Sequence, residues 1–125
     1  METKNTDHAA NLMRDFAKIA KGTTAHIQKM RQDVIYSDGT ITAKVKVLAA
    51  LLWSISARCE PCVRWYAQTA AKHEVSEQEL GEFLAVASTM GGCVGETWAL
   101  KAFEAYQGVK GGGASSSSEP ESCCR

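Results

Sequence analysis

Two cysteines, Cys59 and Cys62, are the residues of this chain best suited to chemistry, and they lie in the segment RCEPCVRWY at 58–66. Cysteines three positions apart are typical of a redox dithiol or of half of a zinc site. If a helix begins at Cys59, its free N–H groups and the positive end of its dipole favour the thiolate of that residue. Arg58 and Arg64 place positive charge nearby. The spacing favours reversible thiol–disulfide exchange, because both sulfurs lie on one face of the helix start.

Tyr66 stands one helical turn after Cys62 on the same face, where it could hydrogen-bond to a sulfur. A phenol is nevertheless a poor base at neutral pH. His73 returns to nearly the same face, but a rise of about 1.5 Å per residue separates it from Cys62 by roughly 16 Å along the axis. Nothing in the sequence places His8 or His26 near the pair. The dithiol is therefore predicted to lack a histidine base.

A metal site and incidental buried cysteines are the alternatives to a redox pair. A zinc ribbon needs a second pair of ligands with matching spacing, and the sequence has none. Zinc would have to use Cys93 with the tail cysteines Cys123 and Cys124, or bind across subunits. Cys93 itself is most simply a small buried residue after a Gly-Gly helix stop, with a third redox thiol as the other interpretation.

The composition is that of an ordinary globular domain, with 125 residues, 45% of them hydrophobic and 22% charged, and a formal net charge of zero. This balance gives no electrostatic reason to expect nucleic acid or an anionic membrane as a partner. The longest apolar run, at 47–53, is far too short to span a bilayer. The polar start has no signal-peptide core, and five unevenly spaced cysteines do not fit a secreted disulfide framework. We therefore expect a cytoplasmic protein.

Apolar residues recur at helical spacing along most of the chain, and no strand pattern outweighs them. The expected helices cover about 7–21, 24–36, 42–58, 59–73, 76–90 and 93–108. Thr42 is a candidate cap of the third helix, and Ser76 with Glu79 forms a capping box for the fifth. Gly91 and Gly92 are expected to end that helix. The chain is therefore predicted to be all-α, with about six helices.

The first two helices each carry one apolar stripe that is predicted to face inward. The stripes comprise Leu12, Phe16, Ile19 and Ala20 in the first helix and Ile27, Met30, Val34 and Ile35 in the second. The helix at 42–58 is apolar nearly all round, which predicts burial on most sides, in a core or a subunit interface.

Residues 1–108 are predicted to form the helical domain, and residues 109–125 a flexible Gly/Ser-rich tail that ends in Cys-Cys. A disordered segment of about fifteen residues has an r.m.s. span of about 20 Å, enough to reach a site on the same or a neighbouring subunit. One hypothesis is that Cys123 and Cys124 carry electrons to or from the Cys59–Cys62 pair. The other two are metal or soft-ion binding and no specific role.

The segment KVKVLAALLWSISARCEPCVRWYAQTAAKHEVSEQELGEFLAVASTMGG resembles the carboxymuconolactone decarboxylase/AhpD-like alkylhydroperoxidase family. It has the family's order of motifs: a Lys-containing apolar helix, the CxxC pair, an alanine-rich helix and an acidic capped helix that ends in Gly-Gly. The match extends over about residues 40–107. The resemblance implies an all-helical fold and homo-oligomers, commonly trimers or hexamers. It also implies a CxxC that cycles between dithiol and disulfide while it reduces peroxides or accepts electrons from a partner.

The resemblance further implies that Cys62 attacks and Cys59 resolves, whereas the dipole argument favours the thiolate of Cys59; we follow the family. The family's proton relay uses a Glu twelve residues before the first cysteine and a His four residues after the second, and here these positions hold Val47 and Tyr66. General acid–base catalysis is typically worth about 10² to 10⁴ in rate, so strong peroxidase activity is not expected. Dithiol–disulfide exchange is less affected than peroxidase activity by the loss of these two groups, because it depends mainly on a thiolate and on the access of a partner to it.

The sequence therefore predicts an oligomeric thiol–disulfide oxidoreductase that uses Cys59, Cys62 and Tyr66 and needs no cofactor, with weak alkyl hydroperoxide reductase (antioxidant) activity as a secondary expectation. Its expected partners are further copies of the chain, as a trimer or hexamer, and a protein or small-thiol reductant. The candidate auxiliary redox thiols are Cys93, Cys123 and Cys124. The alternatives are a cysteine-based module that binds a metal or soft ligand and a catalytically silent oligomeric scaffold. The decarboxylase branch is less favoured, since its chemistry needs no CxxC.

Overall fold

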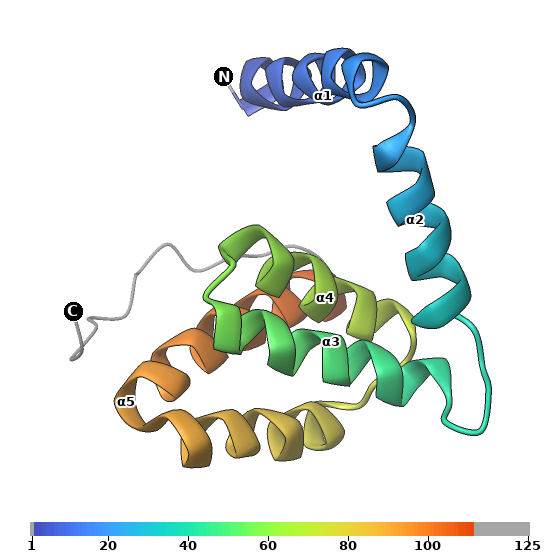
Figure 1. The fold of residues 1–125 in the computed structure, drawn as a ribbon. Coiled ribbons are helices and arrows are strands. Elements are labelled where there is room, and N and C mark those ends of the chain that lie inside the picture. Colours follow the sequence, from blue (N-terminus) through green and yellow to red (C-terminus); the bar gives the residue numbers. More distant parts are fainter. Residues whose placement is uncertain (1, 112–125) are drawn as a thin grey trace. The chain divides into compact units, whose positions relative to one another are not determined.

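The computed structural model describes residues 2–111, with side chains from residue 7 onward. All regular secondary structure in this range is helical (Figure 1), which confirms the predicted all-α class. The helices are α1 (Glu2–Ile19), α2 (Thr23–Val34), α3 (Ala43–Ala57), α4 (Glu60–Lys72) and α5 (Glu77–Lys110). The last two predicted helices are joined in α5. No helix in the described range is long and apolar enough to cross a membrane.

The chain divides into two compact units, Met1–Ser37 and Asp38–Arg125. The first unit holds α1 and α2, and its apolar stripes are not buried as predicted. Leu12, Phe16, Ile19, Ile27, Met30 and Val34 are all exposed, and Ala20 and Ile35 are half-buried. The two helices do not bury these faces against each other, so the apolar faces have no cover within the unit.

The hydrophobic core of the second unit lies among α3, α4 and α5, each of which contacts the other two. The largest fully buried side chains are Leu48, Leu51, Leu80, Val47, Val63, Val75 and Ser54. α3 supplies four of these seven side chains, yet it is less enclosed than its composition predicts, because Trp53 is 70% exposed and Val45 is also exposed. One face of α3 therefore packs in the core, and the other remains open within this unit.

Side-chain caps define the starts of α3 and α5, as predicted. The Thr42 hydroxyl accepts a hydrogen bond from the Val45 N–H at 3.4 Å. Ser76 Oγ accepts from the Glu79 N–H at 3.0 Å, and the Glu79 carboxylate accepts from the Ser76 N–H at 2.9 Å, which confirms the capping box. Lys44 Nζ lies 2.9 Å from Glu79 and links α3 to the start of α5. The Ser76 backbone hydrogen bond and Lys44 together lower the pKa of Glu79 below its ordinary value.

Tyr106 fixes the connection between α4 and α5. Its hydroxyl donates to the C=O of Val75 at 2.5 Å, and both residues are buried. Burial raises the pKa of the Tyr106 phenol, and the charges of Glu77 and Glu79 add to this effect. The phenol therefore keeps its proton, and with it this hydrogen bond, through the physiological pH range.

α5 is interrupted at Gly92, close to the predicted helix stop at Gly91 and Gly92, but the helix resumes at once. Gly92 has φ 61° and ψ −140°, a conformation that glycine adopts readily and other residues do not. Gly95 is buried, and a Cβ atom there would overlap the carbonyl oxygen of Ala87. The two glycines thus allow the halves of α5 to change direction and to approach closely.

The C-terminal part of the chain is only partly described. α5 continues to Lys110, beyond the predicted end of the domain at residue 108. The cysteines Cys123 and Cys124 lie outside the described residues, so the hypothesis that they carry electrons stays a prediction. The assignment of residues 1–108 to one domain likewise stays a prediction.

We expect Glu79 to make the stability of the fold sensitive to acid. Because its pKa is lowered on folding, its contribution is present above the ordinary value of 4.5 and is lost as the pH falls through the lowered folded-state pKa. Glu79→Gln keeps the capping geometry but removes the charge, so it should reduce the free energy of unfolding in urea at neutral pH, and this loss should shrink as the pH falls below 4.5. Glu82→Gln, at an exposed carboxylate of the same helix, is the matched control. A loss for Glu79→Gln that stays the same as the pH falls below 4.5 would contradict the assignment.

Candidate redox site

A tight turn joins α3 to α4 and positions the cysteine pair. Arg58 follows the last residue of α3 and adopts a left-handed backbone conformation, with φ 56° and ψ 41°. Its N–H donates to the C=O of Ile55 at 3.0 Å, and the N–H of Cys59 donates to the C=O of Ser54 at 3.1 Å. These bonds satisfy carbonyl groups at the end of α3 and bring the chain directly into α4.

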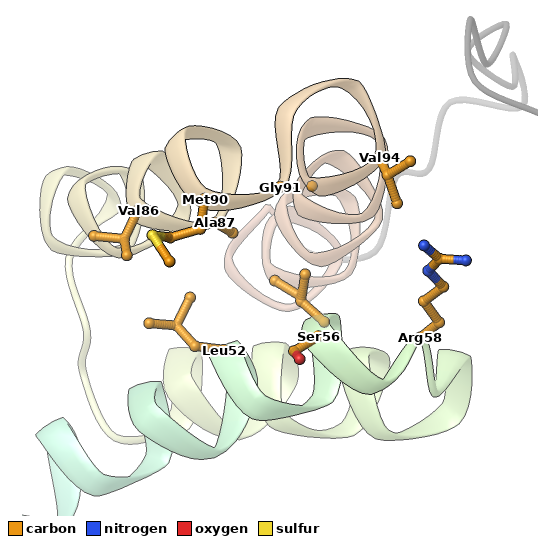
Figure 2. A pocket seen from close by; sticks show the side chains of 10 residues that line it. Leu52, Ser56, Arg58, Val86, Ala87, Met90, Gly91 and Val94 are labelled. Atoms are coloured by element: carbon orange, nitrogen blue, oxygen red, sulfur yellow. The ribbon is translucent and has the colours of Figure 1, made fainter.

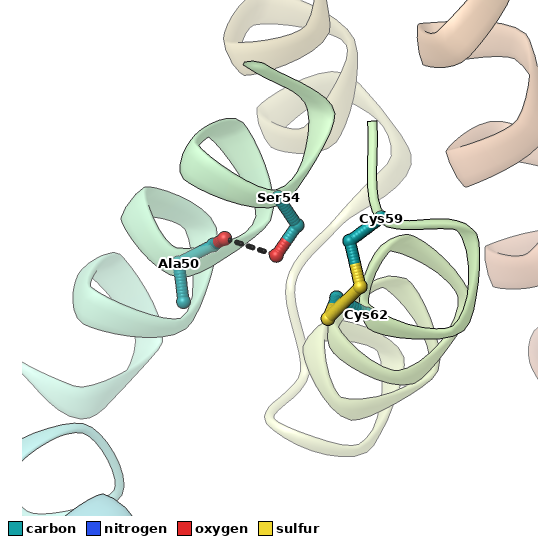
Figure 3. Close-up of a disulfide and its surroundings, with 4 residues drawn as sticks. All are labelled: Ala50, Ser54, Cys59 and Cys62. Carbon is teal, nitrogen blue, oxygen red and sulfur yellow. Dashed lines mark hydrogen bonds between the residues drawn. A yellow bond between two sulfur atoms is a disulfide. The ribbon is translucent and has the colours of Figure 1, made fainter. Parts of the chain in front are cut away.

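Cys59 and Cys62 form a disulfide across the first turn of α4, with their Cα atoms 5.2 Å apart (Figure 3). Cys59 is the N-cap residue and has an extended backbone, and Pro61 lies in the first turn, where its missing N–H leaves no hydrogen bond unmade. Both cysteines are half-buried. The pair therefore lies at the positive end of the α4 dipole, where a thiolate is favoured over a thiol.

Ser54 is a polar neighbour of the pair that the sequence reasoning missed. It is 1% exposed, and its hydroxyl donates to the C=O of Ala50 at 2.8 Å. Its side chain points from α3 toward the disulfide on α4 (Figure 3). The hydroxyl oxygen retains acceptor capacity for a further hydrogen bond. The available signal in the sequence is a lone serine within the apolar run at 47–55.

The two positions expected to carry a proton relay are both buried. Val47 on α3 is fully buried, and Tyr66 on α4, one turn after Cys62, is 8% exposed. These positions thus supply apolar packing and a phenol where the relay would have a carboxylate and an imidazole. The predicted hydrogen bond from Tyr66 to a sulfur stays a prediction.

Glu60, between the two cysteines, has two cationic neighbours. Its carboxylate oxygens lie 3.2 Å from a guanidinium nitrogen of Arg64 and 3.8 Å from Lys101 Nζ on α5. The positive charge predicted at Arg64 is therefore largely offset. Within the described range, the guanidinium of Arg58 has neither a hydrogen bond nor an ion pair. Arg58, next to Cys59, is thus the cation whose charge is not neutralised by a neighbour.

The remaining candidate residues do not converge on the pair. His73 is the C-cap of α4, at the end of the helix opposite the cysteines, as its spacing predicted. His8 and His26 belong to the first unit. Across residues 7–111, no group of three or more His, Cys, Asp or Glu side chains could hold a metal ion.

Cys93 is exposed, so the prediction that it is a small buried residue is wrong. It follows Gly92 directly, where α5 is interrupted, and the prediction placed it in the interior after a Gly-Gly stop. The resumed helix instead turns the nearby Gly95 toward the first half of α5 and leaves Cys93 at the surface.

Comparison with known proteins decides the family. The model of the carboxymuconolactone decarboxylase family matches residues 22–105, more than half of the chain. This chain belongs to that family. A crystal structure of the apo form of a carboxymuconolactone decarboxylase family protein from Legionella pneumophila has a TM-score of 0.73 and 25% sequence identity, and the similarity covers 86% of this chain and 95% of that one. The AhpD-like fold expected from the sequence is thereby confirmed.

A second similarity comes from sequence alone. An uncharacterized protein of Cupriavidus necator is 32% identical over 72 residues, which amount to 58% of this chain and 64% of that protein. The match therefore leaves about a third of that relative uncovered. The family assignment rests on the family model and the Legionella structure, and neither relative carries an activity over to this chain.

We expect Cys93 to react with alkylating reagents while the disulfide is intact. Its exposed thiol is accessible, whereas the sulfurs of Cys59 and Cys62 are bonded to each other. Iodoacetamide added to the oxidised chain should modify Cys93 under native conditions and the pair only after treatment with a dithiol, as read by peptide mass spectrometry. Cys93→Ser serves as the control for site assignment. Modification of Cys93 only in denaturant would show that its thiol is buried after all.

Proposed function

We propose that this carboxymuconolactone decarboxylase family member is a thiol–disulfide oxidoreductase whose redox centre is the Cys59–Cys62 pair. The observation that carries the proposal is the disulfide across the first turn of α4, with Cys59 at the N-cap. A helix start stabilises the thiolate that exchange requires. Partial exposure of both cysteines leaves the sulfurs within reach of a partner thiol.

The reaction is a two-step exchange of two electrons and two protons. A thiolate of the reduced pair attacks a partner disulfide, which forms a mixed disulfide and releases one partner thiol. The second cysteine then displaces the other partner thiol and leaves the Cys59–Cys62 disulfide. The reverse sequence, with a protein or small-molecule dithiol, regenerates the reduced pair. No cofactor takes part in either direction.

The order of attack follows the family, with Cys62 as the attacking thiol and Cys59 as the resolving one. The local charges are in tension with this order, because Arg58 adjoins Cys59 while Glu60 offsets Arg64. The helix dipole acts throughout the first turn, so it favours both thiolates. Single substitutions separate the roles, since only the attacking cysteine can trap a partner as a stable mixed disulfide.

Alkyl hydroperoxide reduction is proposed as a weak secondary activity. The attacking thiolate would cleave the O–O bond, give a sulfenic acid and release an alcohol, and the second thiol would then close the disulfide with loss of water. The departing alkoxide needs a proton, and Val47 cannot supply one. Tyr66 is therefore proposed as the site's own hydrogen-bonding group, which orients the thiol of Cys62.

A homo-oligomer, as a trimer or hexamer, is proposed as the working form. Its support is the apolar surface that each unit leaves open: the faces of α1 and α2 in the first, and Trp53 and Trp65 in the second, which are 70% and 53% exposed. Exposed apolar patches of this kind mark protein interfaces. We further propose a cytoplasmic location, where thiol reductants maintain such a pair.

Redox cycling is tested by mass spectrometry and turnover of the full chain. The peptide with Cys59 and Cys62 should lose the mass of two hydrogen atoms on mild oxidation and regain it with dithiothreitol. Cys59→Ser and Cys62→Ser should each reduce dithiothreitol-dependent reduction of an aromatic disulfide to background, because one thiol cannot close the cycle. Cys93→Ser should retain turnover. Full turnover in both of the first two variants would refute the proposal.

Two other results would point to the alternatives. Protection of the pair from alkylation that disappears on addition of a chelator would support a metal-binding module. A pair that neither oxidises nor exchanges under any of these conditions would support a silent scaffold.

The missing relay generates a separate prediction for peroxide turnover. Tyr66→His places an imidazole one turn after Cys62, and general acid–base catalysis of this type contributes about 10² to 10⁴ in rate when complete. With Val47 unchanged, we expect a gain below this range in the rate of cumene hydroperoxide reduction, with the largest gain near the pKa of the imidazole. Tyr66→Phe controls for loss of the phenol and should show no gain. Circular dichroism checks that the buried position tolerates each change; a folded Tyr66→His without a gain would contradict the relay argument.

A further inference from the structure

A pocket of about 470 Å³ lies in the second unit between α3 and the interrupted helix α5 (Figure 2). Its volume falls within the range of about 300–1,000 Å³ that is typical of small-molecule sites. Leu52 from α3 and Val86 and Met90 from α5 line one end, while Arg58 stands at the other end, near Val94. The pocket is thus apolar along its length and cationic at one end.

The pocket is separate from the redox pair. Leu52 and Ser56, four residues apart, lie on one face of α3 and line the pocket. Ser54 is two residues from each of them, about 200° round the helix. Its side chain points toward the disulfide (Figure 3), and neither cysteine lines the pocket. α3 therefore presents the pocket on one face and the redox pair on the other.

Arg58 gives the pocket its charge. No acidic residue lines the pocket, and the Arg58 guanidinium has no partner within the described range. Its backbone is held by the hydrogen bond from its own N–H to the C=O of Ile55, so the side chain departs from a fixed point. A guanidinium presents parallel N–H groups that match the two oxygens of a carboxylate.

These observations favour a ligand with an apolar body and a single anionic end. An uncharged hydrocarbon would fill the apolar part but leave the guanidinium unused. A compact anion would engage Arg58 and leave the apolar walls exposed to water. Met90, 83% exposed and flexible, can adjust to chains of different length.

We propose that this pocket binds an aliphatic carboxylate, with its chain along Leu52, Val86 and Met90 and its carboxylate on Arg58. The site does not depend on the redox activity proposed for the cysteines, because the pocket contains no sulfur of the pair. Its link to that pair is positional: Arg58 directly precedes Cys59, so the bound carboxylate would neutralise the cation beside the redox centre.

Isothermal titration calorimetry on the full-length chain tests the proposal with decanoate as the probe. Decanoate should bind saturably, and 1-decanol and butyrate should bind at least about tenfold more weakly, because each lacks one of the two contacts. Arg58→Gln should weaken decanoate by about tenfold or more, to the level of 1-decanol, and Arg58→Lys should retain part of the preference. All three residues carry a Cβ atom, so the left-handed backbone is strained to a similar degree in each. The matched control is Arg64→Gln, an arginine on α4 outside the pocket that should bind decanoate as the wild type does.

Two pocket-filling variants make the test independent of charge. Ser56→Trp and Val86→Trp introduce bulk at exposed lining positions, where the fold is least affected, and each should abolish decanoate binding. Absence of decanoate binding to the wild type, or unchanged binding in Arg58→Gln, would overturn the proposal. The main alternative is that the pocket is part of an interface between copies of the chain, and sedimentation velocity tests it. If Ser56→Trp dissociates an oligomer and the wild type binds no decanoate, this alternative holds and the proposal fails.

Discussion

The turn at Arg58 is the constraint on which the arrangement of the second unit depends. The backbone there enters the left-handed region, and the N–H groups of Arg58 and Cys59 return to carbonyl groups of the last turn of α3. Such an ending stops one helix and lets the next begin within two residues. The cysteine pair is placed by this geometry, since Cys59 becomes the N-cap of α4. The same turn fixes the backbone of Arg58 and therefore the direction in which its Cα–Cβ bond points.

The rest of the unit keeps this turn in place through contacts distant in sequence. Tyr106 holds the far end of α4 through its bond to Val75, and Lys44 ties the start of α3 to Glu79 at the start of α5. The exposed Lys44–Glu79 pair contributes little by itself. The hydrogen bond from the buried Tyr106 phenol contributes more to stability, because without it the buried C=O of Val75 would have no donor. Together these contacts fix α3 and α4, the two helices that the turn at Arg58 joins.

Much of the local structure could be predicted from the sequence because it is determined locally. The Thr42 cap, the Ser76–Glu79 box and the start of α4 at Cys59 follow from residue types and short spacings. The break at Gly92 and a helix that resumes directly after it were also predicted, from the glycine pair and the apolar spacing of residues 93–108. The spacing of the two cysteines identified the pair, and its order with the flanking helices indicated the family, which the family model confirms.

The features that escaped prediction depend on three-dimensional neighbours. The apolar periodicity of α1 says that some surface covers it, but it does not say whether that surface belongs to the same unit. The exposure of Cys93 depends on how α5 resumes, and the neutralisation of Arg64 depends on Glu60 and its second partner, Lys101. Ser54 became visible as a neighbour of the pair only when α4 was placed beside α3.

The interruption of α5 also indicates how the pocket could be recognised in other sequences of this family. Gly91, Val94 and Gly95 all line the pocket, so one wall of that pocket is the bend itself. A side chain at position 92 would disfavour the backbone conformation that makes the bend, and a straighter helix would move this wall. In an alignment, glycine at the position of Gly92 therefore indicates that a relative has this pocket, and it can be recognised from the sequence alone. A relative with another residue there is expected to have kept the fold and remodelled or lost the pocket.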